Sequence, residues 1–447
     1  MKRTLIKQAK LVNEGKIVQG SVLVEGDEIK SIFPMGNPLE GQFDEVIDAQ
    51  DYYLLPGIID DHVHFRDPGL TQKGDICSES RAAAAGGVTT IMDMPNTQPQ
   101  TTSIEALKAK LQLLADKSVV NYSCYFGATN QNIDLLAELE EYGVCGIKVF
   151  MGASTGNMLV DRIKSLEAIF KNAKHLIATH CENQDLIRQN TQHYQALHQG
   201  ATDLPLAYHP LIRSAEACYQ SSALAVELAK KHQARLHLLH ISTAKELELF
   251  SNQALADKQI TAEACVSHLL FSEEDYEEYG TKIKCNPAIK TKADQAALRQ
   301  ALLSNKIDVI ATDHAPHLVE DKQGGALKAA SGIPIIQFSL VSMLNLVDQG
   351  VLPLETLVEK MCHNPAQIYR IKKRGFIKEG YKADLVLVQK DSPWTLTPEI
   401  IQSSCGWSPL ENKKMNWKVV KTWINGHLIY NKGTINSNPK GQQIQFL

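Results

Sequence analysis

Eight runs of apolar and β-branched residues recur along the middle of the chain, and nearly all of them end in polar residues. The runs cover residues 55–64, 87–96, 120–129, 145–150, 175–182, 235–242, 260–269 and 307–317. Helical patterns lie between most of them, as in residues 103–117, 161–174 and 214–232. Runs of this kind predict strands. Their repeated alternation with helices predicts an α/β fold, a (β/α)8 TIM barrel.

The two ends of the chain alternate apolar and polar residues with a period of two, interrupted by glycine turns. This pattern occurs in residues 1–54, 375–390 and 416–433 and predicts short antiparallel strands. Because both ends are rich in such strands, we expect the N- and C-terminal segments to form a small β-sandwich. The predicted domains are 1–54 with 366–447 for the sandwich, and 55–365 for the barrel.

Length and composition describe an ordinary globular protein. The chain has 447 residues, of which 44% are hydrophobic and 21% charged; this length suits one large domain with a smaller one. The formal net charge of −4 gives no electrostatic reason to expect nucleic acid or an anionic membrane as a partner. No signal peptide or membrane-spanning stretch is evident. Nine cysteines without a CxxC spacing do not resemble a disulfide framework, which predicts a cytoplasmic protein.

Functional residue types stand at the ends of several predicted strands, where (β/α)8 barrels place their active sites. His62 and His64 lie two residues apart at the end of the first barrel strand. Their imidazoles therefore point to the same face and suit a divalent metal. Further candidates close other strands: His180, His240, Asp313 and, four residues later, His317. A single histidine could be an ordinary hydrogen-bonding group, but several at one barrel mouth predict a metal site.

Lys148 lies inside the predicted fourth strand of the barrel. A protonated amine buried beside a cation is costly, because it loses hydration and is repelled. A neutral lysine amine that captures CO₂ becomes a carbamate, an anionic ligand that can bridge two metals. We therefore expect a carboxylated Lys148. A lysine paired with a neighbouring carboxylate and a Schiff-base lysine are the alternatives.

Eight segments follow one another along nearly the whole chain: HVHFRDPG, MDMPNT, GIKVFMG, THCE, LLHIST, KCNPAI, IDVIATDHAPH and CGWSPLEN. Together they resemble the amidohydrolase superfamily and, within it, the dihydroorotases. The resemblance implies two Zn²⁺ ions per subunit and a homodimer. It assigns one zinc to His62, His64 and Asp313, and the other to His180 and His240, with carboxylated Lys148 between them.

The resemblance also implies a reaction, the reversible hydrolysis of dihydroorotate to N-carbamoyl-aspartate in de novo pyrimidine (UMP) biosynthesis. A pair of metals lowers the pKa of a shared water and so supplies a hydroxide at physiological pH. Asp313 is expected to accept the proton and pass it to the leaving nitrogen, acting as general base and then as general acid.

Substrate recognition is expected to centre on Arg66, whose guanidinium can bind the carboxylate of dihydroorotate through two hydrogen bonds. Asn96 can donate a further bond to the same carboxylate. The substrate-binding set is completed, in part by the resemblance, with His64, Asn286, His317, Ser331 and Gly332. Two other interpretations stay open: Arg66 could pair with Asp67, and Asn96 could cap the helix that follows.

The chain departs from the family pattern at three places. Where many bacterial dihydroorotases have an FTDDG-like segment, this chain has MGASTGNMLVD, which favours the lysine-bridged form. The asparagine of NPPLR is kept as Asn286, but Lys290 replaces the arginine. Gln337 stands where the family usually has glutamate, so the family pattern does not predict the packing around this residue. Residues 152–158 have the glycines and small residues of a loop that could close over the barrel.

Other functions remain as alternatives. An allantoinase or a hydantoinase/dihydropyrimidinase would use the same chemistry on another ring, but neither substrate needs to present a carboxylate to Arg66. A catalytically inactive scaffold is expected to lose metal ligands, and all six predicted ligands are present in this chain.

Overall fold

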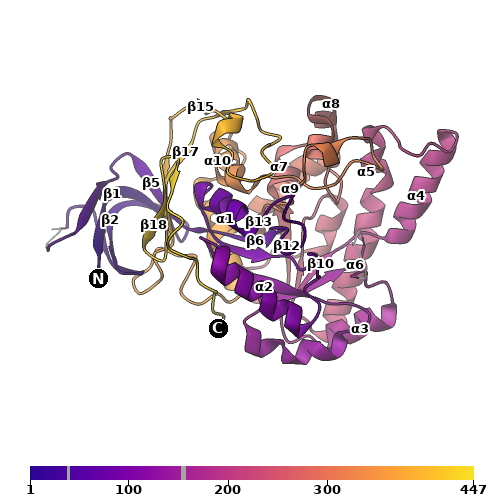
Figure 1. Ribbon diagram of the computed structural model, residues 1–447, viewed down its shortest axis with the longest axis horizontal. Coiled ribbons are helices and arrows are strands. Elements are labelled where there is room, and N and C mark those ends of the chain that lie inside the picture. The colour runs from indigo at the N-terminus through magenta and orange to yellow at the C-terminus, as the bar shows by residue number, and fades with distance from the viewer. Residues whose placement is uncertain (38–40, 153–157) are drawn as a thin grey trace.

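A computed structural model of the protein describes residues 1–37, 41–152 and 158–447. Most of the predicted closing loop, residues 152–158, therefore lies outside the described residues. Figure 1 shows a barrel surrounded by helices, next to a sheet that contains strands from both ends of the chain. Within the described ranges, no helix is both long and apolar enough to cross a membrane.

The barrel consists of eight parallel strands that are hydrogen-bonded in sequence order. They are β6 (Ile58–Val63), β7 (Val88–Asp93), β8 (Asn121–Gly127), β9 (Gly146–Phe150), β10 (Ile177–His180), β11 (Leu236–Leu238), β12 (Ile260–Cys265) and β13 (Val309–Ala311). Each strand falls within one of the eight apolar runs. The predicted TIM barrel is thus confirmed.

Helices connect successive strands on the outside of the barrel. The main ones are α1 (Ile76–Ala85), α2 (Ile104–Lys117), α3 (Ile163–Asn172), α4 (Gln184–Leu197), α6 (Ala215–His232), α9 (Lys292–Leu303) and α10 (Ser339–Asp348). Ser103 and Ser214 cap α2 and α6, since their side chains accept hydrogen bonds from Ala106 N and Ala217 N. Two connections contain 3₁₀ turns instead of an α-helix: Ile133–Tyr142 (η1) and Lys245–Leu249 (η3).

The barrel closes where β6 meets β13, and side chains carry much of this contact. The carboxylate of Asp60 on β6 accepts hydrogen bonds from Thr312 Oγ1 at 2.6 Å and from Thr312 N at 3.2 Å. One residue beyond β6, His64 N donates at 2.8 Å to the carbonyl of His314, which lies three residues beyond β13. These bonds join the first and last strands directly beside Asp313.

The second part is a nine-stranded sheet built from both ends of the chain. Its strands are β1 (Arg3–Asn13), β2 (Lys16–Glu25), β3 (Glu28–Pro34), β4 (Glu45–Asp48), β5 (Tyr52–Pro56), β14 (Leu385–Gln389), β17 (Lys418–Ile424), β18 (His427–Asn431) and β19 (Thr434–Ile435). The N-terminal β5 pairs antiparallel with the C-terminal β14. The expected association of the two ends is therefore present.

A separate two-stranded sheet consists of β15 (Trp394–Thr395) and β16 (Lys414–Met415), and Asn345 on α10 donates a hydrogen bond to the Lys414 carbonyl. The predicted domain boundary after residue 54 falls inside β5, and the one before residue 366 falls inside α12 (Asn364–Ile368). The division into domains itself stays a prediction.

Candidate active site

All twelve predicted site residues line one cavity of about 450 Å³ at the barrel rim. They are His62, His64, Arg66, Asn96, Lys148, His180, His240, Asn286, Asp313, His317, Ser331 and Gly332. Most stand at or just after the carboxyl end of a barrel strand, and parallel strands end on the same rim. The fold therefore brings together residues that are up to 270 positions apart in the sequence.

His62, His64 and Asp313 form a compact group suited to a metal ion. The Nε2 atoms of His62 and His64 lie 3.3 and 3.1 Å from the same oxygen, Asp313 Oδ1. Burial lowers the pKa of both histidines to about 4, which favours the neutral form that binds metals. Burial opposes ionisation of Asp313, but the two imidazoles and Lys148 hold its pKa well below its usual range.

The outer nitrogens of these two histidines are fixed by oxygen acceptors. His62 Nδ1 lies 3.0 Å from Glu263 Oε1, and His64 Nδ1 lies 2.7 Å from Asn96 Oδ1. With a proton on each Nδ1, both Nε2 lone pairs point toward Asp313, the arrangement of a metal-binding histidine. Asn96 does not cap the next helix, because Ser103 does. That interpretation is wrong.

A second pair of histidines stands on the next part of the rim. His180 Nδ1 lies 2.9 Å from His240 Nε2, and burial lowers the pKa of both. The other nitrogen of His180 lies 2.8 Å from Glu182 Oε2, and this carboxylate also pairs with Arg213. The ring nitrogens of two neutral imidazoles thus face each other, an arrangement that suits two ligands of one metal ion.

Lys148 lies on β9 with only 1% of its surface exposed. Its Nζ is 4.8 Å from the ring centroid of Phe150, and within the described part of the chain it makes no ion pair with a carboxylate. Burial lowers the pKa of Lys148 to about 8. The structure therefore gives no support to the alternative of a paired lysine, and it favours an amine that readily loses its proton.

Arg66 also lines the cavity and is held by one main-chain and one side-chain contact. Its Nε donates to the Pro316 carbonyl at 3.0 Å, and its Nη2 lies 3.1 Å from His317 Nε2. Asp67 pairs with Lys117 at 2.7 Å, so the alternative of an Arg66–Asp67 pair is wrong. Burial lowers the pKa of Arg66 to about 10, which leaves it cationic at neutral pH.

The remaining candidates form the wall beside His317. Ser331 O lies 3.1 Å from His317 Nε2. Gly332 adopts φ +146°, and a Cβ there would lie 2.5 Å from the Ala315 carbonyl, so only glycine fits. Asn286 also lines the cavity, and its buried Oδ1 has no hydrogen-bond partner within the described ranges. This oxygen is available to a bound molecule.

Comparisons with known proteins agree with this geometry. Residues 53–429 match the Amidohydrolase family. The chain belongs to the amidohydrolase family. Among curated relatives, the dihydroorotase of Methanosphaera stadtmanae is 33% identical, covering 96% of both chains, and that of Pyrococcus furiosus is 30% identical, covering 98% of this chain and 96% of the relative.

Solved structures with the same fold include a hydantoinase and a dihydropyrimidinase. The L-hydantoinase (dihydropyrimidinase) of Arthrobacter aurescens superimposes with a TM-score of 0.93 at 28% identity, over 100% of both chains. The dihydropyrimidinase of Brevibacillus agri gives a TM-score of 0.88 at 25% identity, over 99% of this chain and 98% of the other. Metal dependence is typical of this family, and the described residues contain suitable groups.

Sequence patterns did not reveal the carboxylates behind the candidate metal-binding histidines of this amidohydrolase. Glu263 contacts His62 and accepts a hydrogen bond from His240 N at 2.8 Å. Glu182 contacts His180. Both residues are fully buried, and each stands at or next to a strand end, which was the available signal. Buried carboxylates of this kind orient histidine ligands and raise their basicity.

Two of the three departures from the family pattern have local explanations in this amidohydrolase. Lys290, in place of arginine, donates to the Ala288 carbonyl at 3.0 Å and to Ser242 Oγ at 3.4 Å. Gln337, in place of glutamate, donates to the Ile400 carbonyl at 2.7 Å and accepts from Gln402 N at 2.8 Å. A carboxylate could not make both bonds, because it has no donor.

Proposed function

We propose that the protein is a dihydroorotase, which hydrolyses dihydroorotate to N-carbamoyl-aspartate reversibly, in pyrimidine biosynthesis. The curated relatives named dihydroorotase support this proposal over nearly the full chain. The observation that carries it is the position of Arg66, a buried cation with no carboxylate partner in the described part of the chain, beside the His64–Asp313 group. An unpaired buried cation of this kind suits a ring that carries a carboxylate.

We further propose that two Zn²⁺ ions occupy the site, one held by His62, His64 and Asp313, the other by His180 and His240. The donor set supports this assignment, since it combines neutral imidazole nitrogens with one carboxylate. When bound, the metals supply a hydroxide nucleophile at neutral pH and polarise the ring carbonyl.

Carboxylation of Lys148 belongs to the same proposal. An amine with a pKa of about 8 is partly neutral at physiological pH, and only the neutral amine adds to CO₂. The resulting carbamate would bring an anion to a site where Asp313 is the only carboxylate lining the cavity among the described residues. It would also remove a buried positive charge close to two cations.

Substrate binding and proton transfer are assigned to different residues of the chain. Arg66 and Asn96 bind the substrate carboxylate; the Asn96 amide nitrogen is available because its oxygen already accepts from His64. Asn286 and His317 contact the ring, with Ser331 and Gly332 forming the wall beside it. Asp313, ionised at neutral pH, accepts a proton as the ring opens and returns it to the leaving nitrogen.

A hydantoinase or dihydropyrimidinase is the second candidate, because solved structures with these names share the fold. An allantoinase is chemically close as well. These rings need no carboxylate anchor, so they give Arg66 no role. A cytoplasmic location and a homodimer stay predictions.

Ring opening of dihydroorotate by the purified protein, followed by ultraviolet absorbance, tests the proposal. We expect turnover that is lost on chelation and restored by zinc, with hydantoin, dihydrouracil and allantoin hydrolysed far more slowly. Bound zinc with turnover of one of those rings alone would replace the proposed substrate. Turnover that persists after complete metal removal would contradict the metal assignment.

A further inference from the structure

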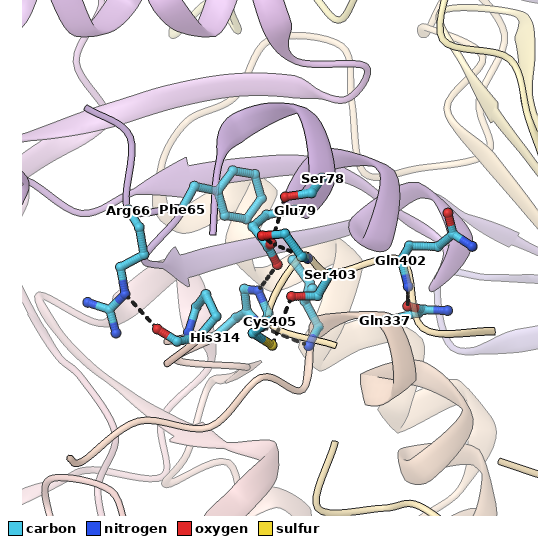
Figure 2. A network of polar contacts seen from close by, with 12 residues as sticks. Phe65, Arg66, Ser78, Glu79, His314, Gln337, Gln402, Ser403 and Cys405 are labelled. Carbon is cyan, nitrogen blue, oxygen red and sulfur yellow. Dashed lines mark hydrogen bonds and ion pairs between the residues drawn. The ribbon is translucent and has the colours of Figure 1, made fainter. Parts of the chain in front are cut away.

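A segment of the C-terminal part, residues 400–407, crosses the barrel rim next to the cavity. We call it the C-terminal strap. Gln337, which precedes α10, holds the first residues of the strap through the two hydrogen bonds of its side-chain amide, to Ile400 and Gln402. Figure 2 shows Gln337 and Gln402 on one side of this network, with Glu79, His314 and Arg66 following across the rim. The strap therefore connects the C-terminal part of the chain to the rim of the barrel.

The middle of the strap reaches a buried carboxylate on α1. Glu79 Oε1 accepts from Ser404 N at 3.2 Å and from Ser404 Oγ at 3.4 Å. Its Oε2 lies 2.8 Å from His314 Nε2, and Figure 2 shows these two residues close together. His314 Nδ1 in turn accepts from Ile335 N at 3.0 Å. His314 is the residue after Asp313, so this branch of the network supports the segment that carries the candidate catalytic residue.

The end of the strap reaches the wall of the substrate cavity. Trp407 is 5% exposed, and its Nε1 donates to the His317 carbonyl at 2.8 Å. Its ring centroid lies 6.0 Å from Lys322 Nζ. This buried lysine donates to the carbonyls of Ala330 at 2.7 Å and Gly332 at 2.8 Å. Trp407 thus supports two parts of the cavity wall near Arg66: the His317 main chain directly, and residues 330–332 through Lys322.

Trp407 itself is not among the described residues that line the cavity. Its effect must pass through the main chain of Pro316 and His317. Arg66 Nε donates to the first of these two carbonyls, and Trp407 Nε1 to the second. A displacement of this short stretch therefore moves the guanidinium. The predicted metal ligands are anchored elsewhere, on the strand ends and by Glu263.

We propose that Trp407 is a positioning residue for substrate recognition: it holds the His317 main chain and thereby aims Arg66 at the carboxylate of the substrate. This inference rests on the proposed function, because it takes the ligand of Arg66 to be the dihydroorotate carboxylate. It assigns to Trp407 an effect on substrate affinity and leaves the hydrolytic step to the metal-site residues.

The test compares Trp407→Phe with a matched control, Trp394→Phe. Trp394 belongs to the same C-terminal part, and its Nε1 also donates to a main-chain carbonyl, that of Trp417, at 2.8 Å. Both substitutions keep an aromatic ring and remove one hydrogen bond. We expect Trp407→Phe to raise KM for dihydroorotate by about two- to tenfold, the range of one such bond. We expect kcat and zinc content to stay within twofold of wild type, and Trp394→Phe to match wild type.

A loss of kcat at constant KM, or equal effects of the two variants, would overturn the inference and indicate a general structural role. If Trp407→Phe does not fold, Gln337→Glu tests the same strap by placing an acceptor against the Ile400 carbonyl. It should raise KM in the same way, and an unchanged KM in that variant would count against the strap.

Amide hydrogen exchange separates this inference from the proposed function. We expect faster exchange at the amides of Ala315, His317 and residues 329–332 in Trp407→Phe than in wild type or Trp394→Phe, whatever ring the enzyme opens. Unchanged exchange would refute the positioning role even in an active dihydroorotase. Wild-type protein that does not open dihydroorotate would refute the proposed function. Faster exchange in the variant would then still support the inference that Trp407 holds the His317 main chain in place.

Discussion

The role of Arg66 is the most direct test of the proposed substrate. Arg66→Ala removes a guanidinium that contacts only Pro316 O and His317 Nε2 within the described ranges. No carboxylate there pairs with it, so the substitution leaves no buried anion without a partner. Arg66 has φ +64°, and alanine or lysine keeps the same backbone cost whereas glycine would relieve it. The folded state should therefore persist in Arg66→Ala and in Arg66→Lys.

The expected rise in KM follows from the hydrogen bonds that Arg66→Ala removes from the bound substrate. Hydrogen bonds to a charged group contribute about 1.5–3 kcal/mol, and each 1.36 kcal/mol is a factor of ten. KM for dihydroorotate should thus rise about 10- to 150-fold in Arg66→Ala. Arg66→Lys should give a smaller rise, because the charge is kept but the planar pair of donors is lost.

Initial rates over a range of dihydroorotate concentrations measure this effect. Melting temperatures and zinc content of the same preparations serve as controls for folding and metal loading. An unchanged KM in Arg66→Ala would refute the carboxylate assignment. A large fall in kcat at constant KM would also contradict it, because an anchor away from the reacting bond should act mainly on binding.

Three further predictions concern the metal site and the barrel seam. Asp313→Asn should retain zinc but lower kcat by about 10²–10⁴, the contribution of a positioned acid/base; wild-type-like turnover would contradict that role. Lys148→Met should lower the zinc content from two ions per chain, measured by elemental analysis, and retention of both would exclude a lysine bridge. Thr312→Val removes the 2.6 Å bond to the buried Asp60 and should lower the free energy of unfolding by about 1–3 kcal/mol in urea titrations. No measurable change there would show that the seam does not depend on this bond.

Local pattern was enough to predict the barrel and to place several histidines and Asp313 at its rim. Apolar runs followed by polar residues identify each strand and its carboxyl end, and parallel strands of one barrel end on a common rim. His62, His180, His240 and Asp313 could therefore be grouped without knowing any distance between them. The His-x-His spacing added that two imidazoles share a face.

The partners of those residues could not be predicted in the same way. Glu263 on β12 stands one strand from His240 and six strands from His62 in the sheet order, yet it contacts both. Sequence periodicity tells which side of a strand a residue occupies, but it does not tell which side chain lies opposite across the barrel. The same limit applies to the flanking sheet, where alternation predicted strands but not that β1 pairs in parallel with β4.

The type of fold and the residues that gather at its rim can be read from the chain, because both depend on local periodicity and on the common direction of the strands. The orientation of those residues depends on how distant segments pack together. Glu79 meets Ser404 across 325 positions, and Trp407 meets His317 across 90. Such contacts arise only when the C-terminal part packs on the barrel, since hydrogen bonds of this kind depend on distances and angles that no local pattern specifies.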